Sequence, residues 1–180
     1  MPKKIVSVYD ENKQEKAYYL MLNEFYNKTS IQDVSKRDEL LSKMLKKVGK
    51  FCIIETPFHT TWGGKNVILG DHIYINYDCM LVDDGDIIIG DHTLIGPRTT
   101  IITNNHAIEA KKRQEGIIEI EEVIIGKNVW IGAGTIILPG VHIGDRTVIG
   151  AGSVVTSDIP SDVVAVGNPC RVIKQIDNTR

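Results

Sequence analysis

Five histidines are the first candidates for chemistry, because a neutral imidazole with an ordinary pKa of about 6.5 accepts a proton readily at neutral pH. His72 and His92 each follow a Gly-Asp turn and His142 ends a repeat unit, so we expect these three to face water. The role of His59 stays open. His106 follows two asparagines at a point where a repeat breaks, and the residues alone leave catalysis and a plain surface position equally open.

The cysteines and the histidine spacing form no metal-binding or redox motif. Cys52, Cys79 and Cys170 are odd in number and have no CxxC spacing, so neither a disulfide framework nor a zinc site is indicated. We expect them to be buried small hydrophobic residues. The histidines are 13, 20, 14 and 36 residues apart, which is a poor spacing for three of them to share a metal ion. No metal requirement is predicted.

Composition limits the classes of partner. The 180 residues fit one domain with at most a small appended segment, and 42% hydrophobic residues suffice for a core. With 21 basic and 23 acidic residues, the formal net charge of −2 gives no reason to expect nucleic acid or an anionic membrane as a partner. No apolar run approaches the roughly 20 residues of a spanning helix, and the N-terminus becomes polar too soon for a signal peptide. A cytoplasmic location is expected by default.

Residues 1–50 have the pattern of a short helical segment. Asp10 can cap a helix over about 12–27, in which one stripe combines Tyr18, Leu22 and Phe25. A variant capping box at 35–38 predicts a second helix, which Gly49 would end. The apolar residues at helical spacing in this second helix are Leu40, Leu41, Met44, Leu45 and Val48.

From about residue 67, an aliphatic residue recurs at every sixth position. The later block comprises Ile125, Ile131, Ile137, Ile143, Ile149 and Val155, and the earlier block comprises Leu69, Ile75, Leu81, Ile89, Ile95 and Ile101. Glycine follows the aliphatic residue in many units, and the fifth position of each later unit is small or β-branched. The step from Leu81 to Ile89 is two residues too long, which predicts a bulged loop near Asp83-Asp84-Gly85.

A period of six residues matches a short strand plus a turn. Three units make a triangular coil of about 18 residues, and stacked coils form a parallel β-helix with the aliphatic residues inside. About a dozen units therefore predict a mainly β chain with roughly four coils. The β-helix domain is expected at 51–180, and the polar, non-repetitive segment at about 104–123 would leave the prism as a protruding functional loop.

Several runs of sequence resemble a known family. IGKNVWIG at 125–132 and ILPGVHIGD at 137–145 are similar to the hexapeptide-repeat acetyltransferase signature, VIGAGSVVT at 148–156 continues it, and GNPCRVI at 167–173 closes it. With the Asn-Asn-His segment and the Asp-Asp bulge, they resemble the maltose and galactoside O-acetyltransferases over nearly the whole chain. The resemblance implies a left-handed parallel β-helix, a homotrimer with active sites between subunits, and transfer of acetyl from acetyl-CoA to a sugar such as maltose, glucose or a galactoside.

The resemblance also assigns roles to single residues. His106 matches the family's catalytic histidine, which would act as general base and take the proton of the attacking sugar hydroxyl. Because a thioester is already activated, direct transfer without an acyl-enzyme is expected. Asn27 stands where relatives often carry an acidic residue, and Ile118 stands where some have methionine. The residues expected to bind the acceptor are Asn76, Asp84, Thr61, Asn27, Trp130 and Ile118.

Acetyl-CoA would lie along a groove between two prisms. The residues expected to contact it are Ala133, Ala151, Thr156, Ser157, Arg171 and Lys174. The two alanines would leave room for contacts to the backbone, and the two cations would bind phosphate groups. Ser157 stands where several relatives carry lysine, which removes one phosphate partner.

Other functions stay open on the residues alone. A gamma-class carbonic anhydrase has the same fold, but it needs three metal-binding histidines that these spacings do not supply. A non-catalytic β-helix trimer is a second alternative. Within the acetyltransferases, the acceptor could be an antibiotic, an amino sugar or an amino acid, because a fold does not fix a substrate.

Overall fold

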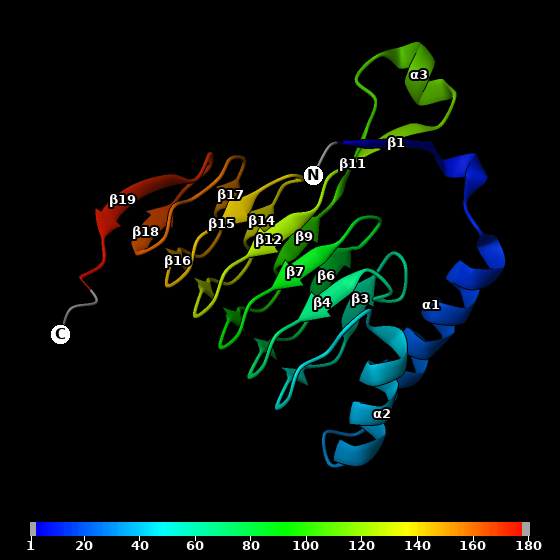
Figure 1. The fold of residues 1–180 in the computed structure, drawn as a ribbon, viewed down its shortest axis with the longest axis horizontal. Coiled ribbons are helices and arrows are strands. Elements are labelled where there is room, and N and C mark those ends of the chain that lie inside the picture. The colour runs from blue at the N-terminus through cyan, green and yellow to red at the C-terminus, as the bar shows by residue number, and fades with distance from the viewer. Residues whose placement is uncertain (1–2, 178–180) are drawn as a thin grey trace.

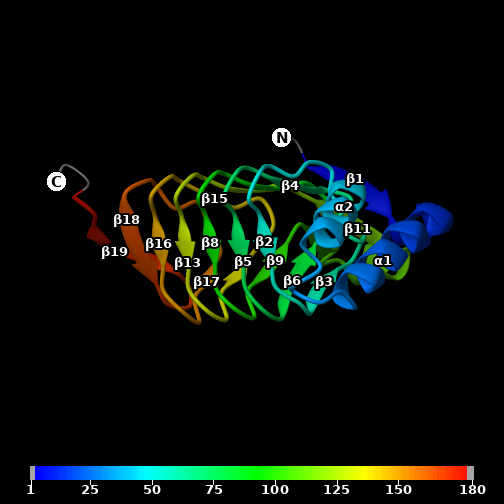
Figure 2. The same ribbon diagram turned by 90° about the horizontal axis from the view of Figure 1, so that it is seen from below.

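The computed structural model describes residues 3–177, apart from the side chain of Asp10. A triangular prism of stacked coils makes up most of the chain, two helices lie at its beginning, and a hairpin with a short helix at its tip rises from one edge (Figure 1). The coils follow one another from the helices to the C-terminal strand (Figure 2). The chain is therefore mainly β, as the repeat predicts.

Each side of the prism is a sheet of short strands. Face one contains β4 (Val67–Leu69), β7 (Ile87–Ile89), β12 (Val123–Ile125) and β15 (His142–Ile143). Face two contains β2 (Ile53–Ile54), β5 (Tyr74–Ile75), β8 (Leu94–Ile95), β13 (Trp130–Ile131), β16 (Val148–Ile149), β18 (Val163–Val166) and β19 (Arg171–Gln175). Face three contains β3 (Phe58–Thr60), β6 (Cys79–Val82), β9 (Thr100–Ile102), β14 (Ile136–Ile137) and β17 (Val154–Val155).

The repeated aliphatic residues stack in register from coil to coil. On face two, for example, Ile75, Ile95, Ile131 and Ile149 are aligned, and each is at most 1% exposed. Every aliphatic residue of the two predicted blocks lies in the core cluster of the prism. The predicted inward direction is confirmed, and burial of this apolar surface, at roughly 25 cal/mol per Å², is the main driving force for the fold.

Two other positions of the repeat satisfy the corners of the prism. The buried fifth-position residues Thr135 and Ser153 donate hydroxyl hydrogen bonds to the carbonyl oxygens of Gly132 (2.8 Å) and Gly150 (2.6 Å). A Cβ atom on Gly132 would stand 2.5 Å from the backbone nitrogen of Ala151 in the next coil, which is too close for any side chain. Small residues are required at these corners because the coils stack backbone against backbone.

The prism has six coils rather than the four predicted. Six parallel strands succeed one another on face two, from β2 to β18, and β19 pairs antiparallel with β18. The first coil, with β2 and β3, and the sixth, with β18, lie outside the two blocks of aliphatic residues at six-residue spacing, so a count of the repeat misses them. Coils two to five contain β4–β6, β7–β9, β12–β14 and β15–β17 in that order.

Two helices cover the beginning of the prism, α1 (Lys13–Asn27) and α2 (Val34–Met44). The N-cap of α1 is Asn12 rather than Asp10, because the Asn12 side chain accepts a hydrogen bond from a backbone N–H of the first turn. Helix α2 begins after Asp33, so the predicted capping box lies inside the helix and does not cap it. The two helices exist as predicted, but both predicted N-caps are wrong, and α2 ends at Met44 rather than just before Gly49.

The buried side of α1 also differs from the prediction. Leu22 and Tyr26 are buried, whereas Tyr18 and Phe25 of the predicted stripe are half exposed. Tyr19, which is partly buried, packs against the core in their place. Because Leu22 belongs to both stripes, the buried side is rotated from the predicted stripe by about 70°, which is less than the 100° of one residue.

Arg37 connects the helices to the first coil. Its buried guanidinium donates to the hydroxyls of Tyr26 (2.9 Å) and Thr29 (3.2 Å) and to the carbonyl of Ile54. The Tyr26 hydroxyl donates to the same carbonyl (2.7 Å), and burial raises the pKa of Tyr26 to about 12. Tyr26 therefore stays a protonated donor at physiological pH and holds α1 against β2.

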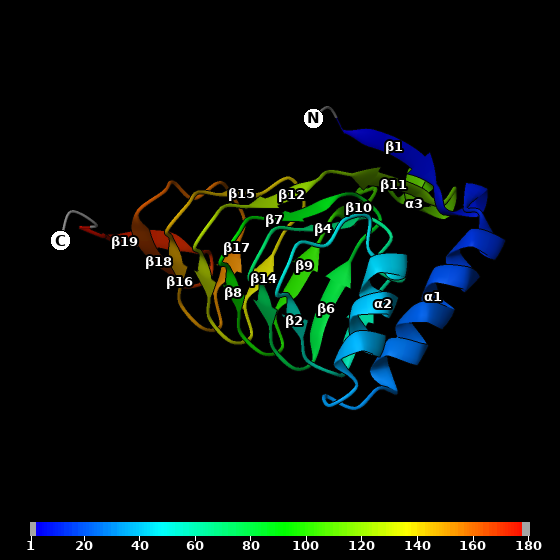
Figure 3. The same cartoon turned by 60° about the horizontal axis from the view of Figure 1, so that its bottom comes forward.

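The segment predicted as a loop is ordered as part of a small antiparallel sheet, which we call the flap (Figure 3). An N-terminal strand, not predicted from the sequence, pairs with the outer side of the hairpin. A 3-10 turn, η1 (Val8–Asp10), leads from this strand to α1. The flap consists of β1 (Lys4–Ser7), β11 (Ile117–Ile120) and β10 (Asn104–His106), with α3 (Ala110–Gln114) between β10 and β11.

Candidate active site

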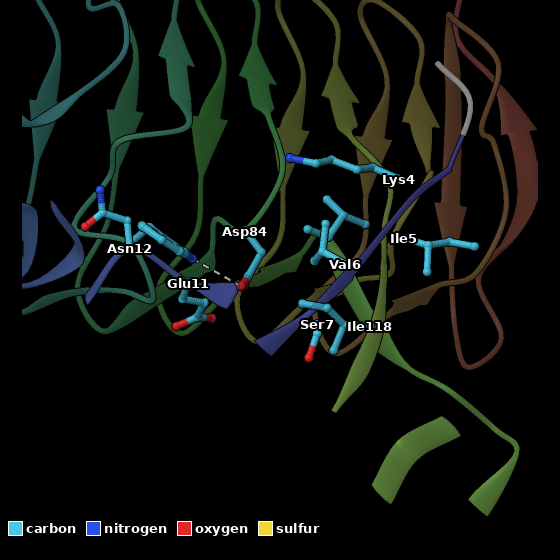
Figure 4. Close-up of a pocket in the computed structure, with 10 residues that line it drawn as sticks. Lys4, Ile5, Val6, Ser7, Glu11, Asn12, Asp84 and Ile118 are labelled. Atoms are coloured by element: carbon cyan, nitrogen blue, oxygen red, sulfur yellow. Dashed lines mark hydrogen bonds between the residues drawn. The ribbon is translucent and has the colours of Figure 1, made fainter. Parts of the chain in front are cut away.

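The bulge between β6 and β7 forms one side of a pocket. We call this corner the 3–1 edge, because it joins face three to face one, and the corner after β5 the 2–3 edge. A pocket of about 330 Å³ lies between the 3–1 edge, the flap and the residues just before α1 (Figure 4). We call it the flap pocket, and its lining residues are Lys4, Ile5, Val6, Ser7, Glu11, Asn12, Trp62, Asp84, Ile118 and Ile120.

Two predicted acceptor residues meet beside this pocket. The Thr61 hydroxyl lies 3.2 Å from Asp84 Oδ2 and 3.3 Å from Asp83 Oδ1, and Trp62 Nε1 donates to Asp84 Oδ1 (3.3 Å). Asp84 makes no ion pair with any residue from 3 to 177. An ionised carboxylate has about four lone-pair sites, so Asp84 keeps capacity to accept further hydrogen bonds from a ligand in the pocket.

His106 lies one strand away from the flap pocket. Its β10 position pairs with Ile118 of β11, and directly opposed residues in an antiparallel sheet project from the same side. Ile118 lines the flap pocket, whereas His106 lines a separate pocket of about 400 Å³ with Lys3, Glu109 and other residues of the flap and its loop. The imidazole is exposed and forms no hydrogen bond with the described part of the chain.

Asn27 is occupied by the backbone of β3. Its Nδ2 donates to the Phe58 carbonyl (2.8 Å), and its Oδ1 accepts from the Phe58 N–H (2.8 Å). Asn27 does not line the flap pocket, so these contacts give no support to the predicted role in sugar binding. They explain instead why an amide, with both a donor and an acceptor, stands at this position.

We expect Asn27→Asp to lower the free energy of unfolding by about 1–3 kcal/mol, because a carboxylate loses the donor to the Phe58 carbonyl and leaves that group unpaired. Urea unfolding followed by circular dichroism measures the change. Asn12→Asp is the matched control, since aspartate caps a helix about as well as asparagine. Equal stability of Asn27→Asp and wild type would contradict this account.

Asn76 and Trp130 lie away from the flap pocket. Asn76 follows β5 on the 2–3 edge, and the four-residue strand β6 separates it from Asp84 by about 13 Å along the strand. Its Oδ1 accepts from the backbone nitrogen of Tyr77 (2.8 Å), as in a turn. Trp130, on the outer side of face two, is 56% exposed. A single chain therefore does not bring the predicted acceptor residues together.

The predicted coenzyme residues fall in three places. Ala133 and Ala151 are exposed on the 2–3 edge of coils four and five, next to glycines around which there is open space. With coils about 4.8 Å apart, Asn76 in coil two and Ala151 in coil five are about 14 Å apart along the axis. Thr156 and Ser157 are exposed on the 3–1 edge of coil five. Arg171 and Lys174 are exposed on β19.

Sequence reasoning missed the residues that the N-terminal segment adds to the flap pocket. The β-branched residues Ile5, Val6 and Val8 could have indicated a strand, but its partner in the flap is more than 100 residues away. Trp62 was also missed as a lining residue. Its ring is flanked by Lys16 (5.0 Å from Nζ to the ring centroid) and Lys65 (5.3 Å), and Glu11 pairs with Lys16 (2.9 Å).

The described residues contain no group of three or more metal-binding side chains placed to hold an ion. Burial raises the pKa of Cys79 to about 11, and burial also raises the pKa values of Cys52 and Cys170. None of the helices within residues 3–177 has the length and apolarity that a membrane crossing requires.

Comparison with known proteins identifies relatives over most of the chain. Residues 122–157 match the family model described as bacterial transferase hexapeptide (six repeats). The chain is 46% identical over 166 residues to a galactoside O-acetyltransferase from Lactococcus lactis subsp. lactis (strain IL1403), which covers 92% of this chain and 80% of that protein. A galactoside O-acetyltransferase from Escherichia coli (strain K12) is 41% identical over 153 residues, which is 85% of this chain and 75% of that protein.

Solved structures agree with these relationships. A maltose O-acetyltransferase from Clostridium difficile 630 superposes with a TM-score of 0.94 at 43% identity, over 97% of this chain and 94% of that chain. A galactoside acetyltransferase in complex with coenzyme A superposes with a TM-score of 0.92 at 38% identity, over 97% and 88% of the two chains. The predicted left-handed parallel β-helix and the predicted co-substrate, acetyl-CoA, are confirmed. The chain belongs to the hexapeptide-repeat acetyltransferases, in the family of the galactoside and maltose O-acetyltransferases, and is an acetyl-CoA-dependent O-acetyltransferase.

Proposed function

We propose that the enzyme acetylates a hydroxyl group of a sugar such as maltose, glucose or a galactoside, with His106 as general base. The flap pocket carries this proposal, because it exposes the Asp84 carboxylate beside the indole of Trp62 and next to the strand that bears His106. A carboxylate accepts hydrogen bonds from sugar hydroxyls, and an aromatic ring packs on the apolar side of a sugar ring.

The chemical step needs only a base and a donor for the oxyanion. The exposed His106 imidazole would remove the proton of the sugar hydroxyl as its oxygen attacks the thioester carbonyl. The tetrahedral intermediate would collapse with loss of the coenzyme A thiolate, which takes up a proton. A backbone N–H is a suitable donor for the oxyanion. Initial-rate kinetics should give intersecting lines, and a ping-pong pattern would contradict direct transfer.

The acceptor class is tested by thiol release from acetyl-CoA with a panel that includes maltose, glucose and galactosides. Release that depends on a sugar, with an acetylated sugar as product, is the expected result. Release that depends only on an amine, an amino sugar nitrogen, an amino acid or an antibiotic would contradict the proposal. The printed names of the two curated relatives and of the maltose enzyme favour the sugar class.

The separation of the predicted site residues within one chain supports a homotrimer with active sites between subunits. Asp84 and His106 belong to the 3–1 edge and the flap, whereas Asn76 and Trp130 belong to the 2–3 edge and face two. A flap from one subunit against face two of the next would combine the two groups. Such a head-to-tail contact closes into a ring when the rotation between subunits allows it.

The surfaces that this arrangement would bury are apolar. Face two presents an aligned row in which Ile53 and Leu94 are each 48% exposed and Trp130 is 56% exposed. At the tip of the flap, Ile108 is 95% exposed. Exposed apolar residues gathered in this way indicate a surface that is covered in the assembly.

Mixed trimers test the shared site. We expect the His106→Ala and Asn76→Ala variants to be nearly inactive alone. Random mixed trimers should regain about a quarter of wild-type activity, because each site takes its His106 and its Asn76 from different subunits. The measurement is thiol release after joint refolding, with each variant refolded alone as control. No recovery in mixtures that sediment as trimers would show that both residues act from one subunit.

A further inference from the structure

Asp83 is a buried carboxylate that organises the loop before β4. Its side chain is 0% exposed, and Oδ1 accepts hydrogen bonds from the backbone nitrogens of Thr61 (3.0 Å) and Trp62 (2.8 Å). Oδ2 accepts from the backbone nitrogens of Gly64 (3.1 Å) and Asn66 (3.4 Å). Both carboxylate oxygens of Asp83 therefore accept hydrogen bonds, and four backbone N–H groups of the loop at 61–66 point toward this one charged group.

A buried carboxylate is costly unless hydrogen bonds replace its water. Burial raises the pKa of Asp83, and the backbone N–H bonds oppose this shift because they favour the ionised form. The backbone N–H groups of a loop can also be satisfied by a neutral carbonyl or hydroxyl, which avoids the free-energy cost of burying a charge. The use of a carboxylate here therefore calls for an explanation, and the contacts of the neighbouring residue Asp84 supply one.

The two residues that Asp83 fixes through their backbone also contact Asp84 through their side chains. Trp62 Nε1 donates to Asp84 Oδ1 (3.3 Å), and the Thr61 hydroxyl shares its one proton between Asp84 Oδ2 (3.2 Å) and Asp83 Oδ1 (3.3 Å). In Figure 4 the dashed line that ends on Asp84 marks the first of these bonds, at the edge of the flap pocket. Asn66 adds a bond from its Nδ2 to the Asp83 carbonyl (2.8 Å), which fixes the peptide between the two aspartates.

We propose that Asp83 is a positioning residue for the acceptor: through Thr61 and Trp62 it holds the Asp84 carboxylate in one orientation, with its remaining lone pairs available to sugar hydroxyls. This inference rests on the proposed sugar acetylation. The two adjacent carboxylates then have different roles. Asp84 lines the pocket and would bind the sugar, whereas Asp83 is buried and holds the loop.

A double-mutant cycle tests the inference. Asp83→Asn replaces one acceptor oxygen by an amide that faces backbone N–H groups, so the loop can no longer hold Asp84. We expect kcat/KM for the sugar to fall by about tenfold to a hundredfold, mainly through KM, with the KM for acetyl-CoA unchanged. In an Asp84→Asn background the same change should have little further effect, whereas a merely structural residue would give effects that multiply.

Asp91→Asn is the matched control. The Asp91 carboxylate also accepts a hydrogen bond from a backbone nitrogen at a turn, that of Asp71 (3.0 Å), but it lies at the corner between faces one and two. This variant should leave the sugar KM unchanged. If Asp83→Asn does not fold, Thr61→Val and Trp62→Phe remove the same links to Asp84 one at a time, and each should raise the sugar KM in wild type but not in Asp84→Asn.

The outcomes separate the two proposals. A wild-type enzyme that no sugar stimulates would overturn the proposed function and this inference together. A sugar-active wild type whose Asp83→Asn variant, or whose Thr61→Val and Trp62→Phe variants, keep the sugar KM would overturn this inference alone. Effects that multiply across the cycle would also overturn it, because Asp83 would then act independently of Asp84.

Discussion

His106→Ala should lower kcat/KM for the sugar by about two to four orders of magnitude, which is the usual contribution of a general base. The loss should fall on kcat, because the base acts in the transition state rather than in ground-state binding. The unfolding temperature should not change, since the His106 side chain is exposed and forms no hydrogen bond with residues 3–177. Thiol release under saturating acetyl-CoA measures the rate, and thermal unfolding checks the fold.

The chain offers a matched control for this variant. His142 is also an exposed histidine on a strand, but it lies on face one, away from the flap. His142→Ala should retain wild-type kinetics. His106→Asn should be nearly as slow as His106→Ala, because an amide keeps the hydrogen-bonding shape without accepting a proton. An active His106→Ala enzyme would remove His106 from the mechanism.

Truncation of one inward side chain of the prism should be the most damaging change to stability. Ile125→Ala should lower the free energy of unfolding by about 2–5 kcal/mol, because the close-packed core cannot collapse into the cavity. Its neighbour Ile124 points outward and is only half buried, so Ile124→Ala should cost clearly less. Urea unfolding at one fixed protein concentration measures both, since subunit association contributes to apparent stability.

The pair Ile124 and Ile125 is informative because the two residues have the same type, strand and neighbours in sequence. They differ only in the side of face one to which they point. Equal losses for the two variants would mean that the outer side of face one is buried in the assembled protein. Such a result would contradict a trimer whose contacts are made by face two and the flap.

Most of the prism could be predicted because its repeat is local. The aliphatic residue of each repeat unit, from Leu69 to Val155, is buried as predicted. The long step before Ile89 corresponds to the bulge that contains Asp83 and Asp84. A period of six leaves few alternative folds, so a short stretch of sequence determines the direction of each side chain. The first and sixth coils were missed because their residues follow no such period.

The helical segment was predicted less well. Its helices are short, and more than one stripe of α1 is apolar, so the sequence does not show which one faces the prism. Tertiary contacts decide this: the Tyr26 hydroxyl finds the Ile54 carbonyl and the buried Arg37, whereas Phe25 stays half exposed. The same limit applies to Asn27, whose partner Phe58 is 31 residues away.

The candidate site divides in a similar way. Asp84 and Thr61 could each be assigned to the acceptor from the family resemblance, and the structure brings them into contact. The part played by Asp83 and Trp62 depends on a loop that folds back over about 20 residues, which no spacing rule predicts. The roles of His106, Asn76 and the coenzyme residues stay predictions until the variants described above are measured.

The stacked coils fix the distances along the prism axis in equal steps. Along the 2–3 edge, Asn76 stands in coil two, Ala133 in coil four and Ala151 in coil five, so the spacing between the proposed acceptor end and the coenzyme end is a whole number of coil heights. Each height is about 4.8 Å, the separation of hydrogen-bonded strands. Insertion or deletion of one coil between them would leave every local contact intact, yet it would shift the thioester from the acceptor by more than three bond lengths. Relatives that use a donor of the same length should therefore vary freely in their loops but keep the coil count between these two points.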